Sequence, residues 1–145
     1  MLAAEPVNGE DAGLRDALAG FGLPTDDLGL EGRCFFRFVA DGQVVGYGGY
    51  EPYGEHALVR SVLVLPEARG RGHGGAMVRF LLDEAARGGA CAAYLLTTSA
   101  EAFFWRLGFS VLDRALAPRE ILATKQATLT CATAPLMRLR LRLSD

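Results

Sequence analysis

The glycine-rich segment 69–75, which reads Arg-Gly-Arg-Gly-His-Gly-Gly, has the residue types and spacing with the most definite chemistry in the chain. It lies between an apolar run at 62–65 and a stretch with apolar residues at helical spacing. Backbone amides at a helix N-terminus are unpaired and partly positive, and glycines let an anion approach them closely. The segment therefore predicts a phosphate or pyrophosphate cradle at a strand–loop–helix junction. A flexible, solvated loop is the alternative interpretation.

Two common phosphate-binding loops fit this segment poorly. A P-loop requires Gly-Lys followed by Ser or Thr, and Lys125 is the only lysine of the chain. Gly70, Gly72 and Gly75 have the Gly-x-Gly-x-x-Gly spacing of a dinucleotide-binding loop, which normally follows the first strand of its fold. Here the glycines come in mid-chain, after an expected hairpin, with no second mononucleotide-binding half.

Helical periodicity, β-rich runs and turn residues predict the elements that must position this loop. Asp41-Gly42 between two β-rich runs predicts a hairpin. Asn8 and Ser99 are the expected N-caps of the first and third helices, and Phe21 is expected on the apolar face of the first helix. The order of elements predicts an α/β or α+β fold with a mixed sheet. We expect helices at 9–19, 74–87, 100–107 and 118–124, and strands at 33–40, 43–51, 57–65, 92–97, 109–114 and 137–143.

A second group of glycines falls inside an expected strand, at Gly46, Gly48 and Gly49. Glycines inside a strand often mark the close approach of another group to the backbone. We expect that group to be the molecule on which the protein acts.

Composition narrows the class of protein. A chain of 145 residues, half of them hydrophobic, suits a single domain over 1–145 with a filled core. The formal net charge of −2 disfavours a nucleic-acid binder. Three separated cysteines without a CxxC pair, together with two histidines, do not predict a metal site. We expect a cytoplasmic protein, since no secretion signal and no apolar run of about 20 residues is visible.

Three motifs, in both their residues and their order along the chain, resemble the GNAT superfamily of N-acetyltransferases. Arg69-x-x-Gly72-x-Gly74 matches its R/Q-x-x-G-x-G/A motif, and Ser61-Val62-Leu63-Val64-x-Pro66 is similar to its fourth strand. The segment 104–109, Phe-Trp-Arg-Leu-Gly-Phe, resembles its Tyr-x-x-x-Gly-Phe signature. The resemblance covers roughly 33–143. It implies the GNAT fold, with a mostly antiparallel central sheet flanked by helices and a splayed V between strands 4 and 5.

The resemblance also implies acetyl-CoA as co-substrate, with no metal. One amide of the fourth strand would polarise the thioester carbonyl, which stabilises the developing oxyanion. Arg69 and Phe104 are further expected at the cofactor. The loop amides implied to hold the pyrophosphate are those of Gly70, Arg71, Gly72, His73, Gly74 and Gly75, and the backbone implied to pair with the pantetheine arm is that of Val62, Leu63 and Val64.

A narrower set of segments is similar to ArsN-type arsenic-resistance N-acetyltransferases, a subfamily close to the phosphinothricin acetyltransferases. It implies direct acetyl transfer to the amine of an amino-acid-like toxin such as arsinothricin or phosphinothricin, and so a role in arsenic resistance and detoxification. The segments are Gly49-Tyr50-Glu51-x-Tyr53-Gly54, Leu58-Val59-Arg60-Ser61, Leu95-Leu96-Thr97-Thr98, Leu107-Gly108-Phe109, Asp113-Arg114, Pro118 and Leu129-Thr130-Cys131-Ala132-x-Ala134.

Direct transfer needs a neutral amine and a protonated leaving thiol. Glu51 is the first candidate base, acting through water, with Glu55 and His56 as runners-up; a solvated loop carboxylate is the alternative for Glu51. The family's usual acid is a tyrosine, and this chain has Phe104 at that position, which has no hydroxyl. Ser61, Thr97 and Thr98 are candidate donors through water, or the thiolate leaves unassisted.

Acceptor recognition is assigned to residues that could bind an acid group. Arg60 and Arg114 offer paired N–H donors to a carboxylate, arsinate or phosphinate, and surface ion pairs are the alternative for both. Tyr53 is expected in the acceptor pocket, with Thr97 and Thr98 nearby. Cys131 is expected to be a small buried residue.

Three readings of function stay open. The favoured one is an acetyltransferase for a small amino-acid-like amine, with a polyamine, an antibiotic or a protein N-terminus as other acceptors. A non-catalytic acyl-CoA-binding regulatory module is the second, because Phe104 replaces the usual tyrosine. An RNA contact by the Arg/Gly loop is the third and needs more basic charge. We expect a small-molecule partner, without nucleic acid or membrane, and a homodimer is left open.

Overall fold

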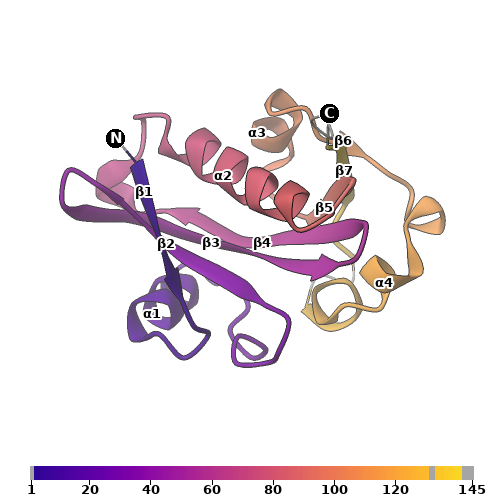
Figure 1. The fold of residues 1–145 in the computed structure, drawn as a ribbon, viewed down its shortest axis with the longest axis horizontal. Coiled ribbons are helices and arrows are strands. Elements are labelled where there is room, and N and C mark those ends of the chain that lie inside the picture. Colours follow the sequence, from indigo (N-terminus) through magenta and orange to yellow (C-terminus); the bar gives the residue numbers. More distant parts are fainter. Residues whose placement is uncertain (1, 131–132, 142–145) are drawn as a thin grey trace. The chain divides into compact units, whose positions relative to one another are not determined.

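The computed structural model describes residues 2–130 and 133–141. Their strands form one mixed sheet (Figure 1). Across the sheet the strands are β1 (Leu2–Val7), β2 (Cys34–Ala40), β3 (Gln43–Tyr53), β4 (His56–Val64), β5 (Ala92–Leu96), β7 (Leu136–Arg140) and β6 (Ser110–Val111). The pairs β1–β2, β2–β3, β5–β7 and β6–β7 are antiparallel, and β4–β5 is parallel, which confirms the predicted mixed, mostly antiparallel sheet.

Four α-helices, two 3₁₀ turns and one π turn accompany these strands in the described residues. The helices are α1 (Ala12–Gly20), α2 (His73–Arg87), α3 (Glu101–Arg106) and α4 (Arg119–Leu122), and the turns are η1 (Pro66–Ala68), η2 (Arg114–Leu116) and η3 (Gln126–Thr130).

The chain divides into two compact units. The first unit comprises Met1–Glu51 and Val59–Asp83, and the second unit comprises Pro52–Leu58 and Glu84–Asp145. Strand β4 and helix α2 contribute residues to both. The single domain over 1–145 stays a prediction.

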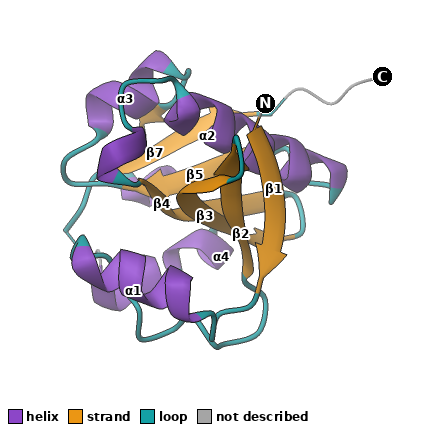
Figure 2. Ribbon diagram, turned by 90° about the vertical axis from the view of Figure 1, so that its left-hand side faces the viewer, coloured by secondary structure: helices purple, strands orange, loops and turns teal. Residues whose placement is uncertain are grey.

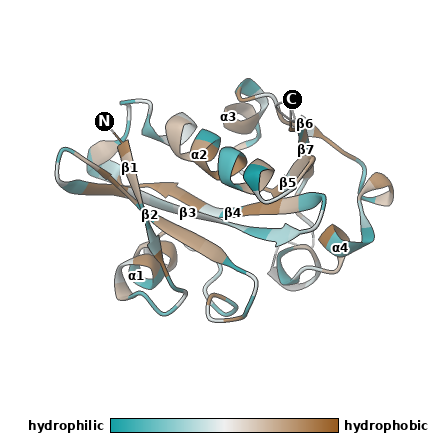
Figure 3. Ribbon diagram, in the orientation of Figure 1, coloured by the Kyte–Doolittle hydropathy of each residue, from teal (hydrophilic) through white to brown (hydrophobic). Residues whose placement is uncertain are grey.

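The first unit packs a helix on each face of its strands (Figures 1 and 2). On one face, Leu14 and Leu18 of α1 join a buried cluster with Phe35 and Tyr47 of the β2–β3 pair. On the other face, Phe80 of α2 makes edge-to-face ring contacts with two phenylalanines of β2, at centroid distances of 5.0 and 5.7 Å. These opposite contacts follow from the strand period of two, which sends alternate side chains to opposite faces. Figure 3 shows α2 carrying hydrophilic residues beside its hydrophobic ones, as expected of an amphipathic helix.

The β2–β3 hairpin is confirmed, whereas strand β1 was not expected. Asp41 and Gly42 both have positive φ, at 51° and 76°, as a two-residue hairpin turn requires. Strand β1 contains alanines and Pro6, which are poor strand formers. Proline is tolerated there because β1 is the edge of the sheet.

Helix α1 begins three residues later than expected, and its cap is a different residue. Asp11 is the N-cap, and its Oδ2 accepts a hydrogen bond from the Leu14 amide at 3.0 Å. Asn8 instead accepts from the amide of Glu10. Phe21 follows the helix and is 41% exposed, so its expected place on the buried face was wrong.

The glycines of β3 are packed against protein groups. A Cβ at Gly46 would lie 2.3 Å from the Leu63 carbonyl oxygen and 2.9 Å from Met77 Cε. At Gly48 the nearest atom is Leu81 Cδ1, and at Gly49 it belongs to Phe35. The close approach predicted for this strand is therefore real, but α2, β2 and β4 make it, and the expectation that a ligand approaches here was wrong.

The second unit pairs β5 with the first residues of β4, at His56–Ala92 through Leu58–Tyr94. Its core contains Leu58, Tyr94, Ile121 and Leu136. Strand β4 continues beyond this paired segment to Val64. The predicted splay between the later parts of β4 and β5 stays a prediction.

Several boundaries in the second unit differ from expectation. Ser99 does not cap α3: the Thr97 hydroxyl accepts the amides of Ser99 and Ala100 at 3.4 and 3.0 Å. Strand β6 has two residues where six were expected. Pro118 was expected to be the first helical residue of α4 but is its N-cap, one position before the helix begins at Arg119. The expected strand end at 142–143 and Cys131 lie outside the described residues.

We expect Gly46→Ala to lower the free energy of unfolding by about 1–3 kcal/mol, because the new methyl group meets the backbone oxygen of Leu63. Chemical denaturation monitored by circular dichroism measures this change. Gly20→Ala is the matched control, since no described atom lies within 4 Å of its Cβ position, and it should leave stability unchanged or slightly raised. Equal stability of the two variants would contradict the packing role of Gly46.

Candidate functional site

The glycine-rich segment lies between η1 and α2, where the sequence placed it. Gly70 and Gly72 have φ of 80° and 78°, the left-handed region that glycine adopts without a steric penalty. Among the described residues, no atom lies within 4 Å of the Cβ position at either glycine. The glycines are therefore required by backbone conformation, and the space beside them is open to a ligand.

Arg69 fastens this loop to the end of β4. Its Nε donates a hydrogen bond to the Val64 carbonyl oxygen at 3.0 Å. Its guanidinium also lies 5.1 Å from the ring centroid of Phe21, within the range of a cation–π contact. Phe21 is thus not a core residue, and its ring contacts an arginine of the loop.

The N-terminus of α2 has the electrostatics of an anion site. Its first turn, described in full, contains no acidic residue. The amides of this turn carry the positive end of the helix dipole, and Arg71 is exposed beside them. Open glycine backbone, helix dipole and arginine fit a pyrophosphate group.

Strand β4 has an irregular residue, Ser61, immediately before the segment expected to pair with pantetheine. Ser61 has φ of 58°, a conformation that costs a non-glycine residue about 1–2 kcal/mol. Asp41 is the other described non-glycine residue with positive φ, and it lies in a hairpin turn. A left-handed residue inside a strand changes the direction of the neighbouring backbone groups, as in a β-bulge.

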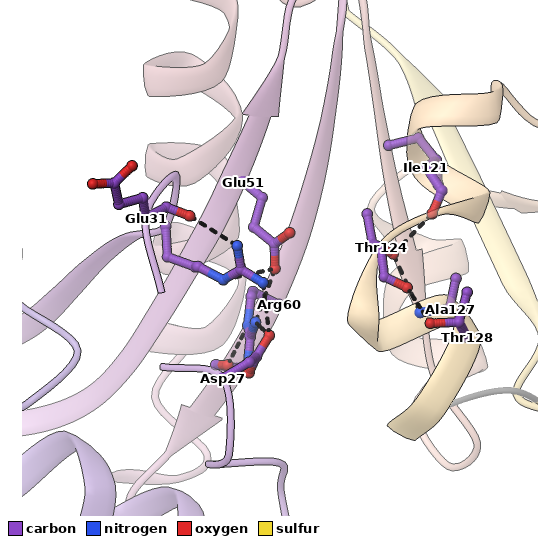
Figure 4. A network of polar contacts seen from close by, with 10 residues as sticks. Asp27, Glu31, Glu51, Arg60, Ile121, Thr124, Ala127 and Thr128 are labelled. Carbon is purple, nitrogen blue, oxygen red and sulfur yellow. Dashed lines mark hydrogen bonds and ion pairs between the residues drawn. The ribbon is translucent and has the colours of Figure 1, made fainter. Parts of the chain in front are cut away.

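A buried ionic network surrounds the side chain of Arg60, the residue before Ser61 (Figure 4). The Arg60 side chain is 0% exposed, and its Nη1 and Nη2 donate to the two carboxylate oxygens of Asp27 at 2.6 and 2.8 Å. Nη1 also donates to Glu51 Oε2 at 2.8 Å. Its Nε donates to Ser61 Oγ at 3.0 Å. Paired bonds of this kind fix a guanidinium in both position and orientation.

Arg33 completes the network on the side of the 21–33 loop. Its Nη2 lies 3.1 Å from Asp27 Oδ2, and its Nε lies 3.8 Å from Glu51 Oε2. Its Nη1 donates to the Glu31 carbonyl oxygen. Two carboxylates and two guanidinium groups therefore balance in charge, which is how buried ions are accommodated.

The network keeps Asp27 and Arg60 charged. Burial raises the pKa of Asp27, but the hydrogen bond and charge of Arg60, with a smaller contribution from Arg33, outweigh it, so the pKa is lowered. Burial lowers the pKa of Arg60, but its bonds to Asp27 and Glu51 outweigh this, so that pKa is raised.

The structure changes the setting of two residues singled out in the sequence. Glu51 lies in β3 and is 0% exposed, so the alternative of a solvated loop carboxylate was wrong. The surface ion pair considered for Arg60 was also wrong, because the pair is buried. Whether Glu51 is a base and Arg60 a substrate ligand stays a prediction. Glu55 is exposed, and His56 is half-buried with its Nε2 3.7 Å from Glu120 Oε2.

In the second unit, the expected acceptor residues make internal contacts. Arg114 donates to the carbonyl oxygens of Ala127 and Ala134 at 3.2 and 2.8 Å. Thr97 organises the start of α3, whereas Thr98 is exposed and Tyr53 half-buried. Phe104 is 7% exposed, and its ring lies 5.0 Å from that of Phe103. Their substrate and cofactor roles stay predictions.

Asp27 and Arg33 were missed by the sequence analysis. Asp27 follows another aspartate, Asp26, and nothing in the local pattern separates the two. Asp26 is exposed, whereas Asp27 is buried against Arg60, 33 residues later. Only the tertiary structure brings these partners together.

Other kinds of site find little support in the described part of the chain. Residues 2–130 and 133–141 include no cluster of three or more His, Cys, Asp or Glu that could hold a metal ion. No helix within the same ranges is long and apolar enough to cross a membrane.

The sequence match identifies the family to which this loop and mixed sheet belong. Residues 31–111 match the acetyltransferase (GNAT) domain. The chain therefore belongs to the GNAT family of acetyltransferase domains. No relative was found among curated protein sequences.

Solved structures share the fold at low sequence identity. N-acetylglutamate synthase from Neisseria gonorrhoeae, complexed with coenzyme A and N-acetyl-glutamate, aligns with a TM-score of 0.79 and 17% identity. The alignment covers 98% of this chain but 35% of the synthase, so this chain spans about a third of that relative's length. A Mycobacterium tuberculosis protein in complex with CoA has a TM-score of 0.77 and 21% identity, over 97% and 99% of the two chains. GCN5 from Tetrahymena has a TM-score of 0.74 and 15% identity, over 91% and 86%.

We expect Asp27→Asn to lower the free energy of unfolding at pH 7 by about 3–5 kcal/mol, because it leaves the buried Arg60 without its bidentate partner. Urea denaturation measures the change. Asp26→Asn is the matched control: this neighbouring side chain is exposed, and its replacement should change stability by less than about 0.5 kcal/mol.

The same pair predicts a pH dependence. Because the pKa of Asp27 is lower in the folded than in the unfolded state, its stabilisation is complete once the pH is about one unit above the unfolded-state value of about 3.9. It is lost as the pH falls from about 5 through the folded-state pKa. Wild-type stability should therefore fall more steeply with acid than that of Asp27→Asn, and parallel curves would contradict the assignment.

Proposed function

We propose that the chain transfers the acetyl group of acetyl-CoA directly to the amine of a small amino-acid-like molecule. The observation that carries this proposal is the left-handed loop at Gly70 and Gly72. The loop leads into helix α2, and no Cβ at these two glycines blocks the approach of a ligand to its backbone. Arg69 bonds the loop to the end of β4. Such a loop suits the pyrophosphate of CoA, and two of the fold relatives were solved with coenzyme A or CoA.

In this proposal the amides of the 70–75 loop hold the pyrophosphate, and the backbone of Val62, Leu63 and Val64 pairs with the pantetheine arm. The amine nitrogen attacks the thioester carbonyl, a C–N bond forms, and the C–S bond breaks with the electron pair leaving on sulfur. A backbone amide of β4 stabilises the oxyanion formed on the way. The amine loses one proton and the thiolate gains one.

Proton transfer is assigned to two neighbours of Arg60. Glu51 is the proposed base, acting through water on an amine whose pKa is about 8. Ser61 is the proposed acid: its oxygen accepts from Arg60 Nε, which leaves its own hydroxyl proton to donate. Thr97 and Thr98 are the other candidate donors.

The acceptor class rests on two lines of support. The subfamily resemblance favours an arsinothricin- or phosphinothricin-like amine, and with it a role in arsenic resistance. The Neisseria synthase was solved with N-acetyl-glutamate, an N-acetylated amino acid. Arg60, Arg114 and Tyr53 are retained as proposed acceptor residues. A cytoplasmic location and a homodimer also stay predictions.

One observation keeps a second function open. Phe104 lies among aromatic rings, 5.0 Å from Phe103 and 5.7 Å from Phe109, where the family usually has a tyrosine acid. A regulatory module that binds acyl-CoA without turnover would not need that acid. It would show acetyl-CoA binding by calorimetry and no CoA release.

A thiol-detection assay for CoA release distinguishes these functions. The amine panel should include glutamate, phosphinothricin, arsinothricin, a polyamine and a peptide N-terminus. Release of CoA with an amino acid analogue supports the proposal. Release with only the polyamine or the peptide would overturn the proposed acceptor class and leave acetyl transfer supported. Binding without release supports the regulatory module.

We expect Gly72→Glu to weaken acetyl-CoA binding at least about tenfold in calorimetry, because it brings a carboxylate into the proposed pyrophosphate site. Gly42→Glu is the matched control: Gly42 also has positive φ and open space at its Cβ position, but it lies in the β2–β3 turn. It shares the backbone strain and the added charge, and should bind as wild type does. Equal affinities of the two variants would overturn the cradle.

A further inference from the structure

Ser61 adopts its left-handed conformation next to Arg60, a fully buried side chain that bonds to two carboxylates. Arg60 has no exposed side-chain surface, and Asp27 from the 21–33 loop grips both of its terminal nitrogens. The remaining nitrogen of the guanidinium, Nε, donates to the hydroxyl of Ser61. The chain of contacts from Asp27 through Arg60 to Ser61 is therefore continuous.

The conformation of Ser61 needs support from outside the residue. Serine does not favour positive φ, and such outliers persist where the surroundings hold them in place. Asp41 has a turn to account for its φ, whereas Ser61 lies inside a strand. The residues that follow, Val62 to Val64, supply the backbone groups that the proposed function assigns to acetyl-CoA.

We infer that Asp27 is a positioning residue: through Arg60 it holds Ser61 in the left-handed conformation and so aims the following β4 backbone at the thioester. This inference rests on the proposed function for its catalytic consequence, but its conformational part does not. Glu51 also accepts a hydrogen bond from Arg60 Nη1, and together with Asp27 it balances the charges of Arg60 and Arg33. Asp27 itself touches neither substrate nor cofactor in this scheme.

Steady-state kinetics tests the catalytic consequence. Asp27→Asn should lower kcat about tenfold or more, because a misplaced reacting group is costly, with a much smaller change in KM for acetyl-CoA, whose pyrophosphate site is intact. Asp26→Asn should behave as wild type. A change in KM alone, or no change in kcat for a folded variant, would overturn the inference.

A double-variant comparison separates positioning from general stabilisation. Glycine adopts positive φ freely, so in a Ser61→Gly background Asp27→Asn should lower kcat far less than it does in wild type. Ser61→Ala is the matched control, since it lacks the hydroxyl but keeps the Cβ that opposes positive φ. It should have a lower kcat than Ser61→Gly, and Asp27→Asn should lower it little further, because the bond from Arg60 to Ser61 is already lost. A full effect of Asp27→Asn in either background, or equal kcat of Ser61→Ala and Ser61→Gly, would overturn the inference.

Backbone NMR of position 61 gives a readout that does not depend on turnover. The HN–Hα coupling and Cα shift should report positive φ in wild type and its loss in Asp27→Asn. Retained positive φ in that variant would overturn the inference, whereas absence of CoA release from wild type would count against the proposed function alone. If Asp27→Asn does not fold, Asp27→Glu keeps the charge but shifts the paired bonds, and the same loss of positive φ is expected.

Discussion

A fully buried arginine is the physical constraint around which the first unit is organised. Arg60 cannot lose its proton, so its charge must be met inside the protein. Asp27 and Glu51 meet it, and they come from a loop and from a neighbouring strand. Because an unpaired buried charge costs several kcal/mol, movement of the 21–33 loop away from Arg60 would lower the stability of the folded state by a similar amount. The network thus converts an otherwise irregular loop into a fixed part of the first unit.

Such a network is an inefficient way to stabilise a fold. The free-energy cost of removing four charged groups from water offsets much of their mutual attraction. Apolar residues of similar size often stabilise a fold equally well. Its benefit is directional: paired bonds leave the guanidinium one orientation, in which Nε reaches Ser61. This explains why a charged network, and not another apolar cluster, lies beside Ser61, the one left-handed residue within a described strand.

The turn and loop glycines were interpreted correctly from the sequence, whereas two helix caps and the tertiary contacts were not. The Asp41-Gly42 hairpin and the glycines of the 70–75 loop depend on φ values that a few adjacent residues impose, so their types reveal them. Strand β1 has a weak pattern and forms because β2 offers it a partner. The glycines of β3 correctly indicated crowding, but the pattern could not tell a ligand from Met77 and Leu81. Asp27 has no local signature at all, because its role depends on a residue 33 positions away.

The tyrosine missing at position 104 weighs less against catalysis than it first suggests. A free thiol has a pKa of about 8.5, so a CoA thiolate is already a reasonable leaving group near neutral pH. An acid at that point improves a step that proceeds without it, whereas stabilisation of the oxyanion is commonly the largest single contribution to such reactions. That contribution needs only a backbone amide held at the right angle. The conformation of β4 is therefore more informative about activity than Phe104 is. In this strand Ser61 is left-handed and Asp27 fixes its neighbour Arg60.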